Sequence, residues 1–254
     1  MTDFNKKLFN NRKSLIIIAC VLFLVVAIII ANYLSYLLIL SASNSSSVTK
    51  DSFSVYMLSL ARSQVKSEAE GRAGDFQSIG GGGYVWEQDD YFYVISSAYA
   101  NKNDAVLVQN SVKANQGLDS EIIEAKFPAL SISGNFSSEE KRVLSMAIDC
   151  FYDYYLALYD IAISLDTLVY NETSAKLALN TSHSNLSNTI SNFNTLFSDA
   201  SGQIEEIKNS CEELLSASNS LCQMSSSSSQ TYSSLLKYHY TLALDLYLKL
   251  AKGL

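Results

Sequence analysis

The chain has 254 residues and a formal net charge of −7, from 18 Lys and Arg against 25 Asp and Glu. An acidic chain without a basic stripe is poorly suited to bind nucleic acid, so we exclude nucleic acid as a partner. A single proline in the whole chain favours long helices over proline-rich linkers.

The first feature is an uncharged apolar run at residues 14–40, long enough to cross a hydrocarbon core of ~30 Å. It is too long for the apolar part of a cleaved signal peptide, so we expect a retained transmembrane helix. Basic residues precede it, and only Lys50 lies close after it. The positive-inside rule then predicts a single-pass protein of the cell membrane, with a cytoplasmic tail at 1–13 and an extracytoplasmic remainder. Residues 41–50 are predicted to be a flexible, serine-rich linker.

A small mixed domain is predicted at residues 51–130. Apolar residues alternate where a strand is expected and recur every three to four residues where a helix is expected. This predicts a strand at 53–60, a glycine-weakened helix at 63–76, a hairpin at 84–95, a helix at 101–116 and a strand at 121–127. The helix at 101–116 has Asn101 as a good N-cap, and Gly117 is its expected stop. The order β-α-β-β-α-β predicts a four-stranded antiparallel sheet with both helices on one face.

The hairpin is the most distinctive stretch, GGGGYVWEQDDYFYV at 80–94. A two-residue turn at Asp89-Asp90 pairs Trp86 with Tyr93. One face of the hairpin is then aromatic-rich, with Tyr84, Trp86, Tyr91, Tyr93 and Ile95, and the other carries Val85, Phe92 and Val94. We interpret the glycine run as a flexible connector, because it precedes a strand and lacks the Lys-Ser/Thr pair of a phosphate loop. An exposed aromatic face suggests a ligand. The alternative is that this face packs on the helical region or on a partner.

This middle segment resembles the SPOR domain of bacterial envelope proteins in order and size. Residues 55–60, VYMLSL, are similar to the V-Q-x-G-S-F that opens the family's first strand, although Tyr56 replaces the glutamine and Leu58 the glycine. Residues 102–105, KNDA, resemble the family's K-x-x-A at the start of its second helix.

The resemblance implies binding of peptidoglycan glycan strands on an open sheet face. Carried over by position, it implicates Tyr56 and Ser59 of the first strand, and Tyr91 and Tyr93 of the third. Tyr84 and Trp86 join this set through the predicted strand pairing. Sugar rings stack on aromatic side chains while tyrosine hydroxyls reach sugar oxygens.

An all-α region is predicted at 137–254, as an antiparallel coiled coil or helical bundle. Apolar residues recur at heptad spacing over 144–169, 179–221 and 232–250. We expect one continuous helix at 173–223; a break at Ser201-Gly202 would instead give four shorter helices in this region. Helices 138–252 are a candidate surface for self-association or a protein partner.

No catalytic constellation is visible, so we expect no enzymatic activity, no cofactor and no metal. His239 is interpreted as a core or interface histidine, and His183 has no visible partners. The cysteines beyond the apolar run, Cys150, Cys211 and Cys222, lack zinc-site spacing. If the first two long helices fold back on each other, Cys150 faces about position 193, far from Cys211, which argues against a disulfide between them.

The fold class is therefore α+β: a transmembrane helix, a SPOR-like sheet domain and a helical region. The predicted function is that of a membrane-anchored, extracytoplasmic protein that binds peptidoglycan through the aromatic sheet face, in division or sporulation. The alternative is a structural or assembly protein that acts through its helices, with the sheet face packed against protein.

Overall fold

The computed structural model describes residues 46–226 and 231–254. The predicted span at 14–40 and the tail before it lie outside these residues. Among the described helices, none combines the length and apolarity of a membrane span. By their contacts, the described residues fall into two units, a small one with Ser46, Ser47 and Ser133–Ser137 and a large one with Val48–Ile132 and Ser138–Leu254. The sites described below lie in the second unit.

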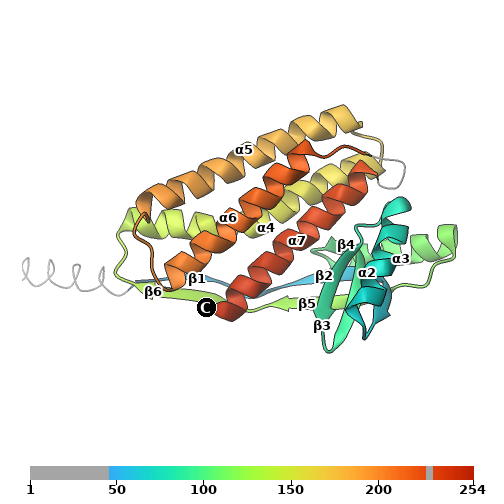
Figure 1. Ribbon diagram of the computed structural model, residues 1–254, viewed down its shortest axis with the longest axis horizontal. Helices are drawn as coiled ribbons and strands as arrows, with labels where there is room; N and C mark the ends of the chain where they lie inside the picture. Colours follow the sequence, from blue (N-terminus) through green and yellow to red (C-terminus); the bar gives the residue numbers. More distant parts are fainter. Residues whose placement is uncertain (1–45, 227–230) are drawn as a thin grey trace, which may run out of the picture. The chain divides into compact units, whose positions relative to one another are not determined.

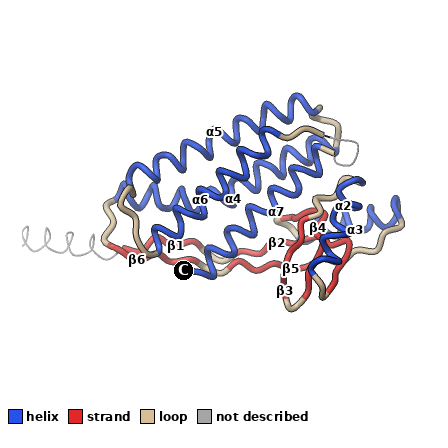
Figure 2. Tube along the Cα trace, viewed as in Figure 1, coloured by secondary structure: helices blue, strands red, loops and turns tan. Residues whose placement is uncertain are grey.

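The described part of the chain is mixed α+β (Figures 1 and 2). Its strands are β1 (Ser46–Lys50), β2 (Phe53–Ser63), β3 (Tyr84–Gln88), β4 (Tyr91–Tyr99), β5 (Glu121–Phe127) and β6 (Leu130–Gly134). Its helices are α2 (Lys66–Ser78), α3 (Lys102–Gln116), α4 (Ser138–Asp166), α5 (Glu172–Leu196), α6 (Gln203–Gln223) and α7 (Tyr232–Gly253).

The four-stranded sheet has the order β3-β4-β2-β5, and neighbouring strands are antiparallel. The predicted β-α-β-β-α-β order is confirmed for this segment. Strand β2 runs three residues further than expected, to Ser63, and its pairing with β4 shifts register on both sides of Ser59. These bulges bend the strand locally. A strand, β1, replaces the last part of the predicted flexible linker, and pairs with β6 in a separate two-stranded sheet.

Helices α2 and α3 both pack on the four-stranded sheet. Helix α3 begins as predicted: the Asn101 side chain accepts a hydrogen bond from the Asn103 N–H at 2.8 Å, and Gly117 ends the helix with φ +68°. Leu58, Tyr99 and Ala105 form a buried cluster under α3. Glycines do not prevent α2 from forming, because its packing on β4 and β2 offsets their low helix propensity.

Helices α4 to α7 form a four-helix bundle, in which α4 contacts α5 and α7, and α6 contacts α5 and α7. The expected continuous helix at 173–223 is wrong. Helix α5 ends at Leu196 and α6 begins at Gln203, after Gly202 adopts φ +57°. Such a backbone conformation is costly for other residues and lets the chain reverse direction here. The heptad spacing continues across the break because α5 and α6 both pack their apolar faces into the same core.

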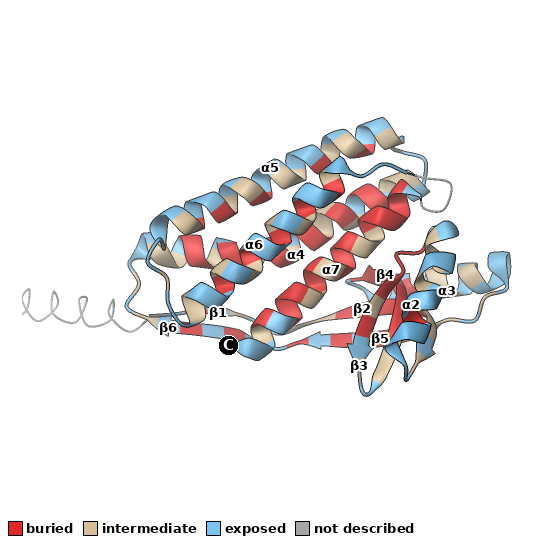
Figure 3. Cartoon of the chain, in the orientation of Figure 1, coloured by how far each residue is buried: buried red, intermediate tan, exposed pale blue. Residues whose placement is uncertain are grey.

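Helix α7 is the most buried of the four (Figure 3). It packs on α4 and α6 and also on β3 and β4. An ordinary bundle helix keeps a polar stripe for solvent. Helix α7 instead has protein on both sides, so the sheet and the bundle share one core.

Candidate functional site

The hairpin that organises the candidate site has the predicted register. Trp86 pairs with Tyr93, and Tyr84 with Ile95. The turn residues Asp89 and Asp90 have φ of +50° and +64°, the conformation of the two-residue turns that match strand twist. Aspartate tolerates this conformation better than most residues, so the turn fixes which side chains share a face.

The aromatic face of the hairpin is nevertheless closed. Tyr84 and Tyr93 are each 8% exposed and Trp86 is 1% exposed, so the expectation of an open sheet face is wrong. Helix α7 covers it. The Tyr84 hydroxyl donates to Asp245 Oδ2 at 2.6 Å, and its ring lies 5.2 Å from that of Tyr238. Burial, then the charge of Asp245, raises the pKa of Tyr84 far above its usual value.

Aromatic rings continue this contact into the bundle. The Phe127 ring lies 6.4 Å from Trp86, 5.9 Å from Tyr247 and 4.6 Å from Phe53, between ring centroids. These separations are typical of packed aromatic pairs. Phe127 is thus placed between a strand of the hairpin and α7. The face predicted to bind a ligand is part of the protein's own core.

Tyrosines of the bundle also satisfy the backbone of β4. The Ala98 N–H donates to the Tyr240 hydroxyl at 3.2 Å, and the Tyr155 hydroxyl donates to the Ala98 carbonyl at 3.3 Å. Buried backbone groups need such partners. Tyr155 of α4 and Tyr240 of α7 therefore have a structural role.

Two of the predicted binding residues lie elsewhere. Tyr56 packs against the cluster under α3, on the opposite face from Trp86. Ser59 is fully buried, and its hydroxyl donates to the Ala61 carbonyl at 2.8 Å within the bulge. The six predicted residues, Tyr56, Ser59, Tyr84, Trp86, Tyr91 and Tyr93, are therefore not brought together as one exposed site.

The glycine run is a packing surface and not a free connector. A Cβ on Gly82 would lie 3.0 Å from the backbone of both Lys237 and Tyr238. Lys237 Nζ donates to the Gly80 carbonyl at 2.9 Å and pairs with Asp166 Oδ2 at 2.7 Å. The absence of a side chain at Gly82 lets the first turns of α7 approach the sheet.

What remains open is the turn end of the hairpin. Tyr91 is half-buried, and the Arg62 guanidinium lies 5.1 Å from its ring centre. A groove of about 850 Å³, which Tyr91 itself does not line, is reached through Gln88, the residue that pairs with Tyr91 across the hairpin. Its other lining residues include both turn aspartates, Glu124 and Lys126 of β5, and Asp245, Lys249 and Lys252 of α7. The Trp86 indole N–H donates to Gln88 Oε1 at 3.4 Å at the edge of this groove. We name Gln88, Tyr91, Lys126 and Lys249 the hairpin-end site.

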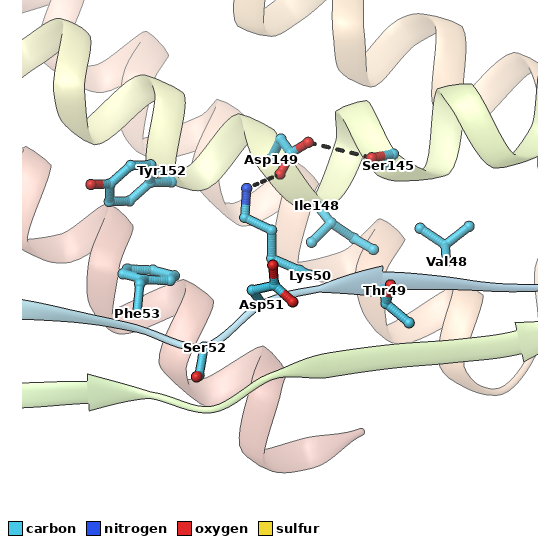
Figure 4. A pocket seen from close by; sticks show the side chains of 10 residues that line it. All are labelled: Val48, Thr49, Lys50, Asp51, Ser52, Phe53, Ser145, Ile148, Asp149 and Tyr152. Atoms are coloured by element: carbon cyan, nitrogen blue, oxygen red, sulfur yellow. Dashed lines mark hydrogen bonds and ion pairs between the residues drawn. The ribbon is translucent and has the colours of Figure 1, made fainter.

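A second cleft, of about 440 Å³, lies between residues 48–53 and α4 (Figure 4). Lys50 forms an ion pair with Asp149, which also accepts from the Ser145 hydroxyl at 3.3 Å. Phe53 and Tyr152 close one end, with ring centres 4.8 Å apart. Both Asp149 oxygens therefore have partners, and Asp51 is the second carboxylate that lines this cleft.

A buried polar network in the bundle was missed from the sequence. Ser218, fully buried on α6, accepts from the Tyr154 hydroxyl at 2.8 Å and lies 2.9 Å from His183 Nδ1. A serine–histidine pair suggests a nucleophile, but this serine has no access to solvent. The contact joins residues of three helices and forms because α6 folds back along α4 and α5, so the sequence alone does not indicate it.

His239 lies buried on α7, as predicted for a core histidine, and its Nδ1 has no hydrogen-bond partner. Burial lowers its pKa to about 4. Among the described residues, no group of three His, Cys, Asp or Glu side chains is arranged to hold a metal ion.

No family model matches the chain, and no curated protein matches it. One solved structure does: the solution structure of the peptidoglycan binding domain of the B. subtilis cell wall lytic enzyme CwlC. It is 24% identical, covers 30% of this chain and 95% of its own, and has a TM-score of 0.26.

Proposed function

We propose that the chain is a non-enzymatic, membrane-anchored protein of the cell envelope that binds peptidoglycan glycan strands through the hairpin-end site. The single observation that carries this proposal is the open polar groove at the turn of the hairpin. The resemblance to SPOR domains supports it, as does the observed order of strands and helices. The anchor at 14–40 and a role in division or sporulation belong to the same proposal.

The chemistry of the groove suits a sugar. Gln88 supplies both a donor and an acceptor, the carboxylates accept from hydroxyls, and Lys126 and Lys249 donate. Tyr91 offers a partly exposed ring on which the apolar side of a sugar can stack.

Sedimentation with purified peptidoglycan tests the proposal, using the full chain in detergent micelles. We expect the wild-type protein to pellet with the wall material. The double variant Gln88→Ala/Tyr91→Ala should bind about tenfold more weakly, because the lost contacts are worth ~1–2 kcal/mol. The variant Tyr170→Ala/Gln223→Ala removes the same residue types far along the bundle and should bind like the wild type.

Two results would contradict wall binding at this site. The first is a wild-type protein that stays in the supernatant. The second is a Gln88→Ala/Tyr91→Ala variant that pellets as well as the wild type while the fold is intact by circular dichroism. Release of soluble sugar from the wall during the assay would contradict the non-enzymatic part of the proposal.

An assembly role is the second candidate, favoured by one observation. Large apolar side chains are exposed around the connection between α4 and α5: Leu168 by 88%, Val169 by 72% and Leu177 by 70%. Clustered apolar exposure is typical of protein contacts. If this corner mediates self-association, light scattering should show a larger particle for the wild type than for Leu168→Ser/Leu177→Ser. Equal masses would exclude self-association through this corner.

A further inference from the structure

Two buried thiols from different helices meet in the bundle. Cys150 of α4 donates to the Ala147 carbonyl at 3.1 Å, and Cys211 of α6 lies 3.6 Å from the same oxygen. The two side chains also contact each other. Cys150 is 6% exposed and Cys211 is fully buried. The prediction that they lie far apart is wrong, because the break at Gly202 turns α6 back against α4.

The two sulfurs differ in access. Cys150 borders a groove of about 310 Å³ between α4 and α5, together with Met146, Asp153 and Asn185. Cys211 does not line this groove. A small reagent in the groove can therefore reach Cys150 but not Cys211.

We propose that Cys150 and Cys211 are a disulfide-forming pair, in which Cys150 reacts first and Cys211 resolves. The oxidant is a small organic disulfide. The Cys150 thiolate attacks one of its sulfurs, forming a mixed disulfide and releasing one small thiol. The Cys211 thiolate then attacks the Cys150 sulfur and releases the second small thiol.

The exchange is balanced. Two protein thiols are oxidised to one disulfide, and the small disulfide is reduced to two thiols, which take up the two cysteine protons. The product joins α4 to α6.

The contact with Cys211, and then burial, raise the pKa of the Cys150 thiol. Little thiolate is therefore present at neutral pH, and the first step is slow.

The test uses the reduced full chain in detergent, with Cys222→Ser as background because Cys222 is half-buried and would react independently. The probe is cystamine, followed by acid quenching, digestion and mass spectrometry. We expect a cross-link between the peptides that carry Cys150 and Cys211, with the loss of two hydrogens. Cys211→Ser should accumulate a cystamine adduct on Cys150.

The order of reaction has its own control. In Cys150→Ser, the adduct on Cys211 should form at less than about one tenth of the rate at Cys150 in Cys211→Ser, because Cys211 is shielded. In denaturant the two rates should become equal. Absence of the cross-link in the folded chain would overturn the proposal, and equal adduct rates in the folded variants would overturn the order. The cross-linking measurement needs no substitution at either cysteine, so a variant that fails to fold does not remove the test.

Discussion

Substitution of Gly82 by alanine tests whether α7 closes the aromatic face of the sheet. The new Cβ would lie 3.0 Å from backbone atoms of Lys237 and Tyr238, closer than ordinary van der Waals contact. Helix backbone cannot move aside as the end of a flexible side chain can. Gly82 does not have a positive φ, so alanine there meets only this steric obstacle. The expected cost is that of overpacking, about 1–3 kcal/mol.

Gly74 provides the matched control. It lies in α2, and a Cβ there would meet nothing within 4 Å. Alanine has the higher helix propensity, so Gly74→Ala should stabilise the protein by about 1 kcal/mol. The same chemical change therefore has opposite expected signs at Gly82 and Gly74. With each kcal/mol worth about 2–4 °C in a chain of this size, the two Tm values should separate clearly.

Urea unfolding measures both effects. Trp86 is the only tryptophan and is buried at the contact with the bundle, so its fluorescence reports the separation of sheet and helices directly. A Gly82→Ala variant as stable as Gly74→Ala would refute the close approach of α7. That result would instead support the open aromatic face that the sequence predicts.

Three further predictions concern buried polar groups. The lowered pKa of His239, about 4, favours the neutral ring in the folded state, so the stability present above pH ~6.5 is lost as the pH falls toward 4. As the pH is lowered from 8 to 5, the wild type should therefore lose about 2 kcal/mol of unfolding free energy that His239→Leu keeps. Urea unfolding at both pH values measures this difference, and an equal pH dependence of the two proteins would contradict the prediction. Burial raises the pKa of Tyr99 to about 12, so the folded state loses stability as the pH rises above ~10. At pH 11 this loss is about 1.4 kcal/mol of unfolding free energy, and urea unfolding of Tyr99→Phe should show that the variant does not suffer it. Ser218→Ala should lower the free energy of unfolding by about 1–3 kcal/mol, because Tyr154 and His183 lose their partner, and Tyr154→Phe in the same chain should reduce the penalty.

The sequence predicts a structural feature correctly where all the residues that determine the feature lie in one short stretch. The Asp89-Asp90 turn set the hairpin register, and Asn101 with Gly117 bounded α3. Alternation along the hairpin assigned each side chain to a face. The occupant of that face could not be read, because it is Tyr238 and Asp245, more than 150 residues away in the chain.

The bundle illustrates the same limit. Heptad spacing predicted apolar seams, but a seam is compatible with one long helix or with two that reverse. The conformation at Gly202 decided between them, and with it the contact between Cys150 and Cys211. The glycine run packs against α7 and is not a flexible connector, and the sequence could not show this for a related reason. A glycine required by a neighbouring backbone resembles a glycine required for flexibility when only the sequence is seen.

The position of α7 also has a consequence for how the chain folds. The contacts that close the sheet join residues far apart in the sequence: Tyr84 to Asp245 across 161 positions, and Gly80 to Lys237 across 157. Contacts of such separation slow folding, because a long loop must close before they form. During synthesis from the N-terminus, the sheet is complete long before Tyr232–Gly253 emerges. Until then Tyr84, Trp86 and Tyr93 have no cover. Shortening the chain before α7 should therefore leave this aromatic surface exposed, and an exposed apolar surface of this kind favours aggregation.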